Sequence, residues 1–288
     1  MGLRINTNIE AINVHGNLKS ANNSIAKSLE RLSSGYRINA AKDDAAGFAV
    51  ANAFRAKISS LKVCQQNAAE ANSMLQIADG AYGKILDILI RMKDLATQAA
   101  SGQLEDASLQ RLNDEFGYLQ DEVDRISTST TYSAYNAACL QLLSGDFDTT
   151  LGGTMITYQV GSSNRTDNQV AISFTAACTL GLGVAKNLGI AVSTQASAQA
   201  AMDAIDGALS SINIAMARVG SYQNRLDYTT QNLAVQIENF SASESTIRDV
   251  DMAAEMMEFT KNQILQQASM AMLSQANMAP QQVLSIIG

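Results

Sequence analysis

Residues that could perform acid–base or nucleophilic chemistry are scarce in this 288-residue chain. His15 is the single histidine and stands among polar residues, so no Ser-His-Asp or Cys-His arrangement is indicated. The three cysteines are too widely separated for a disulfide framework or a paired-thiol metal site; they are Cys64, Cys139 and Cys178. Their oxidation state stays open. We predict no enzymatic activity, no cofactor and no metal.

Two short motifs have both a chemical and a structural interpretation. Asp43 and Asp44 could form a catalytic or metal-binding carboxylate pair, but adjacent acidic residues before a helix more often cap its first N–H groups. We therefore predict a helix cap. The segment Gly181-Leu182-Gly183 lacks the strand-to-helix context of a nucleotide-binding loop, and we predict a turn there.

The elements that must position these side chains are long helices. From residue 61 to residue 99 apolar residues alternate three and four positions apart, a repeat typical of helices packed along one narrow seam. The series is Leu61, Cys64, Ala68, Ala71, Leu75, Ala78, Tyr82, Ile85, Leu89, Met92, Ala96 and Ala99. The same spacing recurs over 109–126 and 201–240. A break at Ser101-Gly102 predicts that the second helix returns antiparallel to the first.

Residues 127–195 lose the helical spacing and are rich in Ser, Thr and Gly. Apolar residues alternate over 156–160 and again over 170–174, around a polar connection, which predicts a β-hairpin. We place this hairpin at the tip of a helical rod. An outward-facing tip would offer hydroxyl groups for O-linked glycans, and the candidate positions are Ser127, Thr128, Ser129 and Thr130. An unmodified loop is the default interpretation.

The two terminal segments carry only thin apolar stripes among Asn, Ser and Gln. Helices this polar are marginal in isolation, so we expect them to pair with each other or with neighbouring copies. Ser33-Ser34-Gly35 predicts a helix stop. Half of the 12 methionines lie from Met252 onward. A Met-rich face is either an adaptable binding surface or core filling, and both interpretations stay open.

These patterns predict a mainly α fold: a long antiparallel coiled-coil-like helical rod with a small β-hairpin tip and paired terminal helices. The expected domains are a terminal-helix domain formed by 1–44 and 247–288, rod helices over 45–126 and 196–246, and a tip over 127–195.

Charge and hydropathy exclude two classes of partner. The net charge of −7 and the absence of a dense Lys/Arg cluster argue against nucleic-acid binding. Uninterrupted apolar runs fall short of 18 residues, so we predict no membrane span. We also expect no cleavable secretory signal, because the N-terminus lacks a basic region followed by an apolar core.

Two pairs of motifs resemble the bacterial flagellin family. Leu32–Asn39 and Lys42–Gly47 are similar to its N-terminal signature, and Ile247–Ala253 and Phe259–Ala268 are similar to its C-terminal signature. The likeness covers residues 1–126 and 196–288 in the family's order. About 67 residues separate the rod helices, which indicates a short form without large outer variable domains.

The resemblance implies a structural subunit that self-assembles into the flagellar filament for swimming motility. Its terminal helices would be disordered in the free subunit and form concentric inner tubes in the polymer. It further implies secretion through the flagellar export channel to the extracellular filament. The implied partners are other copies, an export chaperone at the C-terminal helix, the filament cap and hook-associated proteins. A hook–filament junction protein with the same terminal helices is the alternative, and a helical adhesin or toxin is a more distant one.

The resemblance also assigns residues. We expect inner-tube contacts at Leu3, Ile5, Ile12, Leu265, Met272 and Leu284. The segment Leu89–Ala96 is similar to the one that a vertebrate Toll-like receptor grips in many flagellins. Arg91, Leu95 and Glu115 fall on the matching positions, so we expect them to form a rod surface for subunit contacts or for receptor recognition.

Overall fold

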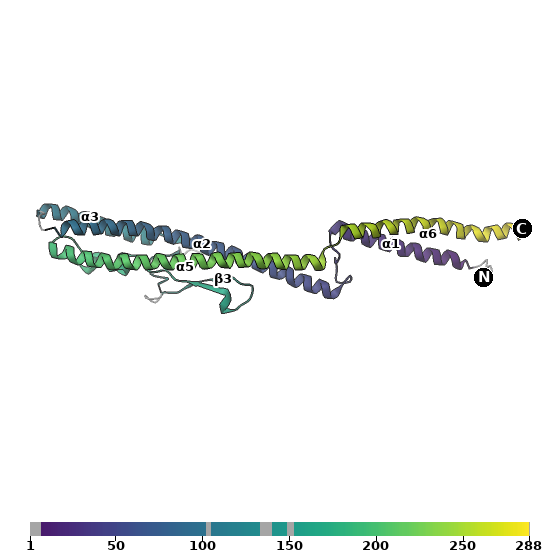
Figure 1. Cartoon of the computed structure of the whole chain (residues 1–288), viewed down its shortest axis with the longest axis horizontal. Coiled ribbons are helices and arrows are strands. Elements are labelled where there is room, and N and C mark those ends of the chain that lie inside the picture. The colour runs from purple at the N-terminus through teal and green to yellow at the C-terminus, as the bar shows by residue number, and fades with distance from the viewer. Residues whose placement is uncertain (1–6, 102–104, 133–139, 149–152, 288) are drawn as a thin grey trace. The chain divides into compact units, whose positions relative to one another are not determined.

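Long helices make up most of the chain, whose computed structural model describes residues 7–101, 105–132, 140–148 and 153–287 (Figure 1). The α-helices are α1 (Ile9–Ser34), α2 (Ala45–Ala99), α3 (Asp106–Ser129), α4 (Thr179–Leu182), α5 (Gln195–Arg248) and α6 (Met252–Ile287). The strands are β1 (Thr131–Tyr132), β2 (Leu140–Gln141), β3 (Ile156–Gln159) and β4 (Gln169–Ile172), with short 3-10 helices η2 (Thr166–Asn168) and η3 (Lys186–Leu188). The predicted mainly α fold is confirmed.

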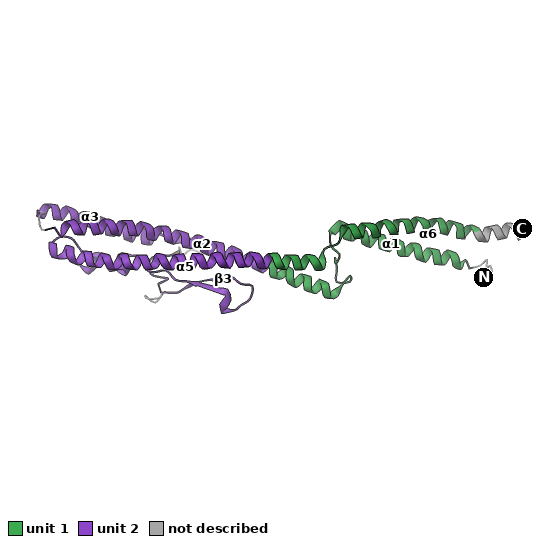
Figure 2. Cartoon of the chain, in the orientation of Figure 1, with its two compact units in different colours: residues 1–58, 238–288 green, residues 59–237 purple. Residues whose placement is uncertain are grey.

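The chain divides into two units, residues 1–58 with 238–288 and residues 59–237 (Figure 2). The expected limits of the terminal-helix domain, after residue 44 and before residue 247, lie inside the first unit. That unit includes the start of α2 up to Ile58 and the end of α5 from Glu238.

In the unit of residues 59–237, one continuous apolar core runs between α2 and α5. Every position of the seam predicted from residue 61 to residue 99 is at most 4% exposed, so this prediction is confirmed. The buried residues of α5 continue the same three-four spacing; they are Ala198, Ala201, Ile205, Ala208, Ile212, Ala215, Val219, Leu226 and Leu233. At the edge of the core, Lys93 Nζ lies 2.5 Å from Asp206 Oδ1 and joins α2 to α5.

Helix α3 returns along α2, as the break near Ser101 predicts, and it widens this core. Phe116 and Val123 of α3 are buried against it. On α2, Met74 and Leu95 are buried beside the predicted seam. A helix covered by two neighbours must bury a wider stripe than a helix in a simple pair, which explains these two additional positions.

Buried polar groups hold the segment after β4 against α3. Gln120 is 2% exposed, and its Nε2 donates to the carbonyl oxygens of Val184 at 2.7 Å and Ile190 at 3.2 Å. Asp124 accepts from the backbone N–H and the hydroxyl of Thr179, at 2.8 and 2.9 Å. Because a buried amide left unpaired is costly, these bonds fix the route of a segment that has little regular structure.

Strands β3 and β4 form the predicted antiparallel hairpin, with Ile156 opposite Ile172 and Gln159 opposite Gln169. Its position differs from the expected tip, because the hairpin lies along the flank of α2. Asn67 Nδ2 donates to the Gln159 carbonyl at 2.9 Å, and the Tyr158 hydroxyl lies 3.4 Å from Met74 Sδ. Alternation gives β4 one apolar face, and that face is buried by packing on the helical core rather than projecting beyond it.

A second, two-residue ladder pairs Thr131 with Gln141 and Tyr132 with Leu140. Two residues are too few to produce a recognisable alternation, so the sequence pattern does not predict these strands.

In the unit of residues 1–58 and 238–288, helix α1 begins and ends at sequence-encoded signals. The Asn8 side chain accepts from the Ala11 N–H at 3.0 Å and caps the helix N-terminus. Gly35 has a φ of 74° and donates its N–H to the Arg31 carbonyl, which confirms the predicted stop. Asp44 accepts from the Gly47 N–H at 3.0 Å, and this bond is the cap predicted for the start of α2.

Because the unit of residues 59–237 depends on the α2 seam, substitutions at neighbouring residues of α2 should differ greatly in their effect on stability. Leu89 is 0% exposed and Ile90 is 48% exposed on the same turn of α2. We expect Leu89→Ala to lower the free energy of unfolding of the monomer by about 2–5 kcal/mol, because it removes buried methyl groups and leaves a cavity. The matched control Ile90→Ala should change it by roughly 0.5 kcal/mol or less. Denaturant unfolding followed by circular dichroism measures both, and equal losses would contradict the seam.

Candidate assembly surfaces

Helices α1 and α6 pack together along a seam whose most deeply buried residues are small or polar. These residues are Ala21, Ser28, Asn262 and Ala276. Asn8 Nδ2 donates to the Ala276 carbonyl at 2.8 Å, and Gln266 Nε2 donates to Asn22 Oδ1 at 2.7 Å. The predicted pairing of the terminal helices is therefore present, but it leaves its larger apolar side chains incompletely buried.

The large apolar side chains of these two helices fall into two groups. Val14, Leu18, Ile25, Leu32, Phe259 and Leu273 are half-buried. In the described part of the chain the others are exposed: Ile9, Ile12, Leu29, Met252, Met256, Met257, Ile264, Leu265, Met270, Met272 and Met278. The pair thus carries an outward apolar surface, which is a mark of interaction sites on soluble proteins. The Met-rich segment supplies part of this surface and does not fill a core.

Three of the residues expected to make inner-tube contacts lie on this surface. Ile12 is 60% exposed, Leu265 is 47% exposed and Met272 is 60% exposed. Leu3 and Ile5 lie outside the described residues. Leu284 lies on α6, in the part whose side chains are not described.

A contact that helical periodicity could not predict joins the segment after α1 to the segment between α5 and α6. The motifs at 32–39 and 247–253 lie against each other, with Tyr36 and Asp249 forming an isolated antiparallel bridge. The Arg37 N–H donates to the Arg248 carbonyl at 2.7 Å, and the Arg248 guanidinium lies 4.2 Å from the centroid of the Tyr36 ring. These contacts involve extended backbone next to helix ends, where there is no repeat to recognise.

The acidic pair at residues 43 and 44 has structural partners on both carboxylates. Asp43 Oδ1 lies 3.1 Å from Lys27 Nζ, and its other oxygen accepts from the Ala40 N–H. The hydrogen bond from Lys27, helped by the Ala40 N–H, holds the pKa of Asp43 below its ordinary value. With Asp44 engaged as the cap of α2, the predicted cap is confirmed, and the ion pair of Asp43 with Lys27 is an addition from the structure.

Of the three residues expected on the rod surface, Arg91 and Glu115 are exposed and Leu95 is not. Arg91 donates to Glu115 Oε1 through Nε at 3.1 Å and Nη2 at 2.7 Å, and both side chains are exposed. Leu95 is 1% exposed, so it belongs to the core and not to the surface. The structure corrects this assignment because Leu95 lies on the side of α2 that α3 covers.

The structure also corrects the prediction of glycan positions in the Ser-Thr run at the end of α3. Ser127 is 1% exposed, and its hydroxyl donates to the Leu143 carbonyl at 2.8 Å, so it does not offer a glycan site in this fold. Thr128 and Ser129 are exposed, and Thr130 is half-buried. The hydroxyls of these three residues donate to carbonyls one turn earlier in α3.

Within the described residues, no group of three or more His, Cys, Asp or Glu side chains could hold a metal ion. Cys64 is buried, and its burial raises the pKa of its thiol; Cys178 is half-buried, and both are free. Cys139 lies outside the described residues. No described helix has the length and apolarity needed to cross a membrane.

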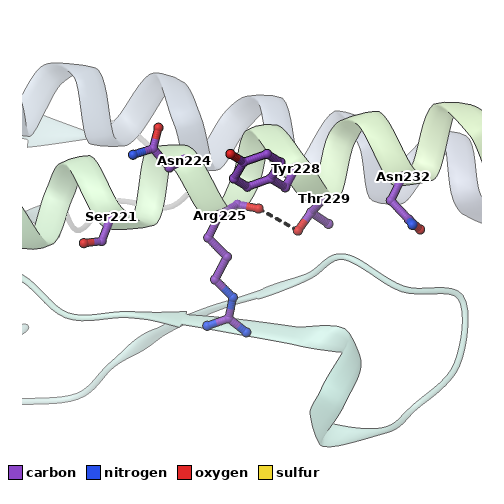
Figure 3. A pocket seen from close by; sticks show the side chains of 6 residues that line it. All are labelled: Ser221, Asn224, Arg225, Tyr228, Thr229 and Asn232. Carbon is purple, nitrogen blue, oxygen red and sulfur yellow. Dashed lines mark hydrogen bonds between the residues drawn. The ribbon is translucent and has the colours of Figure 1, made fainter.

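A surface depression lies along α5. It has a volume of about 660 Å³ and is lined by Ser221, Asn224, Arg225, Tyr228, Thr229 and Asn232 (Figure 3). All of these side chains come from one helix, and Arg225 extends from α5 toward the hairpin strands (Figure 3). Catalytic groups usually converge from several elements, so this shallow groove is not a candidate active site.

Comparisons with known proteins agree with this architecture. Residues 5–145 match the family model described as the bacterial flagellin N-terminal helical region, and residues 202–287 match the C-terminal helical region. The flagellin of Halalkalibacterium halodurans is 38% identical over 98% of this chain and 99% of its own length. A flagellar filament core protein of Brachyspira hyodysenteriae is 38% identical over the same shares of both chains.

Among solved structures, the crystal structure of Bacillus cereus flagellin is 31% identical and covers 62% of this chain and 94% of its own, with a TM-score of 0.46. With both terminal regions matched by family models and near-full-length relatives of this similarity, the chain belongs to the bacterial flagellin family.

Proposed function

We propose that copies of this chain polymerise into an extracellular bacterial flagellar filament through the outward faces of α1 and α6. The observation that carries this proposal is the exposed apolar surface of the terminal pair. Eleven large apolar side chains in the described part of the two helices are exposed, while the residues buried most deeply between the helices are small or polar. Full burial of one such side chain contributes about 1.5–3 kcal/mol, so neighbouring copies that cover these faces would stabilise the pair strongly.

Assembly would bury apolar surface that the isolated α1–α6 pair leaves exposed. Ordering a helix costs conformational entropy, and most helices recover it by packing a large apolar face. The α1–α6 seam leaves many large apolar side chains exposed, and contacts with neighbouring copies would supply further compensation by burying them. Contacts between different surfaces on successive copies do not close into a ring and so build an open helical fibre.

The exposed face of α6 also calls for partners before assembly. An unpolymerised subunit carrying this surface would tend to aggregate, so an export chaperone that covers α6 fits its chemistry. We extend the proposal to secretion through the flagellar export channel and to contacts with the filament cap and hook-associated proteins. No observation favours the alternative role at the hook–filament junction, since the similar curated proteins are named for the filament.

Removing α1 tests the assembly role. We expect a chain lacking residues 1–32 to remain a soluble, partly helical monomer, because the unit of residues 59–237 keeps its own core. It should form no filaments in electron micrographs at concentrations where the full chain forms them. The point variant Ile12→Asp, which changes an exposed side chain, should reproduce the defect without altering the helical content. Abundant filaments from the shortened chain would refute the role given to α1.

A second proposal concerns the exposed Arg91–Glu115 ion pair, which supports recognition by a vertebrate flagellin-sensing Toll-like receptor. We expect Arg91→Ala to lower the signalling potency of the monomer roughly tenfold, as loss of a charged contact at a binding hot spot does. Lys84→Ala is the matched control, because Lys84 is also exposed on α2 and pairs with a residue three positions away. Reporter cells expressing the receptor measure both variants. A wild-type monomer that gives no signal would end this proposal.

A further inference from the structure

The described methionines differ widely in exposure: Met202 and Met216 of α5 are half-buried, and Met155 is 53% exposed. Met74 and Met92 are fully buried in the core along α2. By contrast, every methionine of α6 is 47–69% exposed: Met252, Met256, Met257, Met270, Met272 and Met278. Peroxides oxidise a thioether that solvent reaches much faster than one enclosed in a core. The free subunit therefore presents its oxidisable sulfur atoms mainly on one helix.

All six methionines lie about 80° or more around the α6 axis from Asn262, on exposed sides of the helix. At 3.6 residues per turn, Met252, Met256, Met270 and Met278 fall within a sector of about 80°. Asn262 is buried against α1 and lies outside that sector. The oxidisable groups thus occupy the surface that has no partner within the chain.

We propose that the α6 methionines are a modification site through which peroxide oxidation blocks assembly. A sulfur lone pair attacks one oxygen of hydrogen peroxide, an S–O bond forms, the O–O bond breaks and the second oxygen leaves as water. Sulfur is oxidised by two electrons and the peroxide is reduced by two. The product is a polar sulfoxide, which is unfavourable to bury without a hydrogen-bond partner. This inference rests on the proposed assembly through α6.

The oxidised monomer should otherwise keep its fold. The modified sulfur atoms are at the surface, whereas the sulfur atoms of Met74 and Met92 lie in the core. Thiol oxidation at Cys64 competes weakly, because the thiolate is the reactive form and burial raises the pKa of this thiol. The effect is therefore specific for assembly, and it ends once neighbouring copies cover α6.

The test uses the full-length subunit, kept monomeric, treated with hydrogen peroxide and then with catalase. Peptide mass spectrometry should find sulfoxides on the six α6 methionines and on the exposed Met155, ahead of Met74 and Met92. Sedimentation should then show a critical concentration for filament formation raised by about tenfold or more, the size expected for burying polar groups at an apolar contact. Methionine sulfoxide reductases A and B, supplied with a dithiol, should restore the original value.

Two variants separate the α6 sulfur atoms from other oxidised groups. Replacing the six α6 methionines with leucine retains the apolar face and all three cysteines, and this variant should assemble normally after peroxide. Met155→Leu, which removes an exposed methionine outside α6, should remain as sensitive as the wild type.

The outcomes distinguish failure of the oxidation inference from failure of the proposed function. Oxidised wild type that assembles at its original critical concentration overturns the inference, and so does a six-leucine variant that peroxide still inactivates. If the six-leucine variant does not assemble even untreated, the repair experiment decides, and repaired protein that stays inactive overturns the inference. Failure of the untreated wild type to assemble instead refutes the proposed function, and the inference with it.

Discussion

The structure depends on one physical constraint, which is that a long helix buries a single narrow stripe. In α2 that stripe holds apolar residues three and four positions apart, and α5 presents a stripe with the same spacing. Small alanines in both stripes allow the helix backbones to approach closely. Elsewhere in this unit, α3 and the hairpin pack on a surface that the α2–α5 pair has already fixed, and they widen its core at Leu95 and Met74.

The two helix pairs differ in how completely they bury their apolar residues. Along α2 and α5 the large apolar residues face inward, so residues 59–237 possess a core of their own. Along α1 and α6 the most buried residues include Ser28 and Asn262, larger residues such as Leu18 and Phe259 are half-buried, and many others are exposed. Hydrogen bonds such as that from Asn8 to Ala276 set the register of this second pair, while contributing only modest net stability. The chain therefore combines a unit with its own core, residues 59–237, and a terminal helix pair whose exposed apolar side chains suit association.

Much of this arrangement could be predicted from the sequence, because buried helical stripes leave a periodic record. The spacing predicted the α2 seam, the returning helix and the hairpin strands, and local chemistry predicted the stop at Gly35 and the cap at Asp44. What could not be predicted depends on which faces meet. Leu95 and Ser127 are buried because α2 and α3 each have a second neighbour. The position of the hairpin and the Tyr36–Asp249 bridge depend on contacts between segments far apart in the sequence, which no local pattern records.

The bond between Asn8 and Ala276 spans 268 positions of the chain. A pair of helices joined by such remote residues cannot close fully until nearly the whole polypeptide has been made. Contacts of such long range are also slow to form. The unit of residues 59–237 can therefore form its core before the terminal helices are paired along their full length.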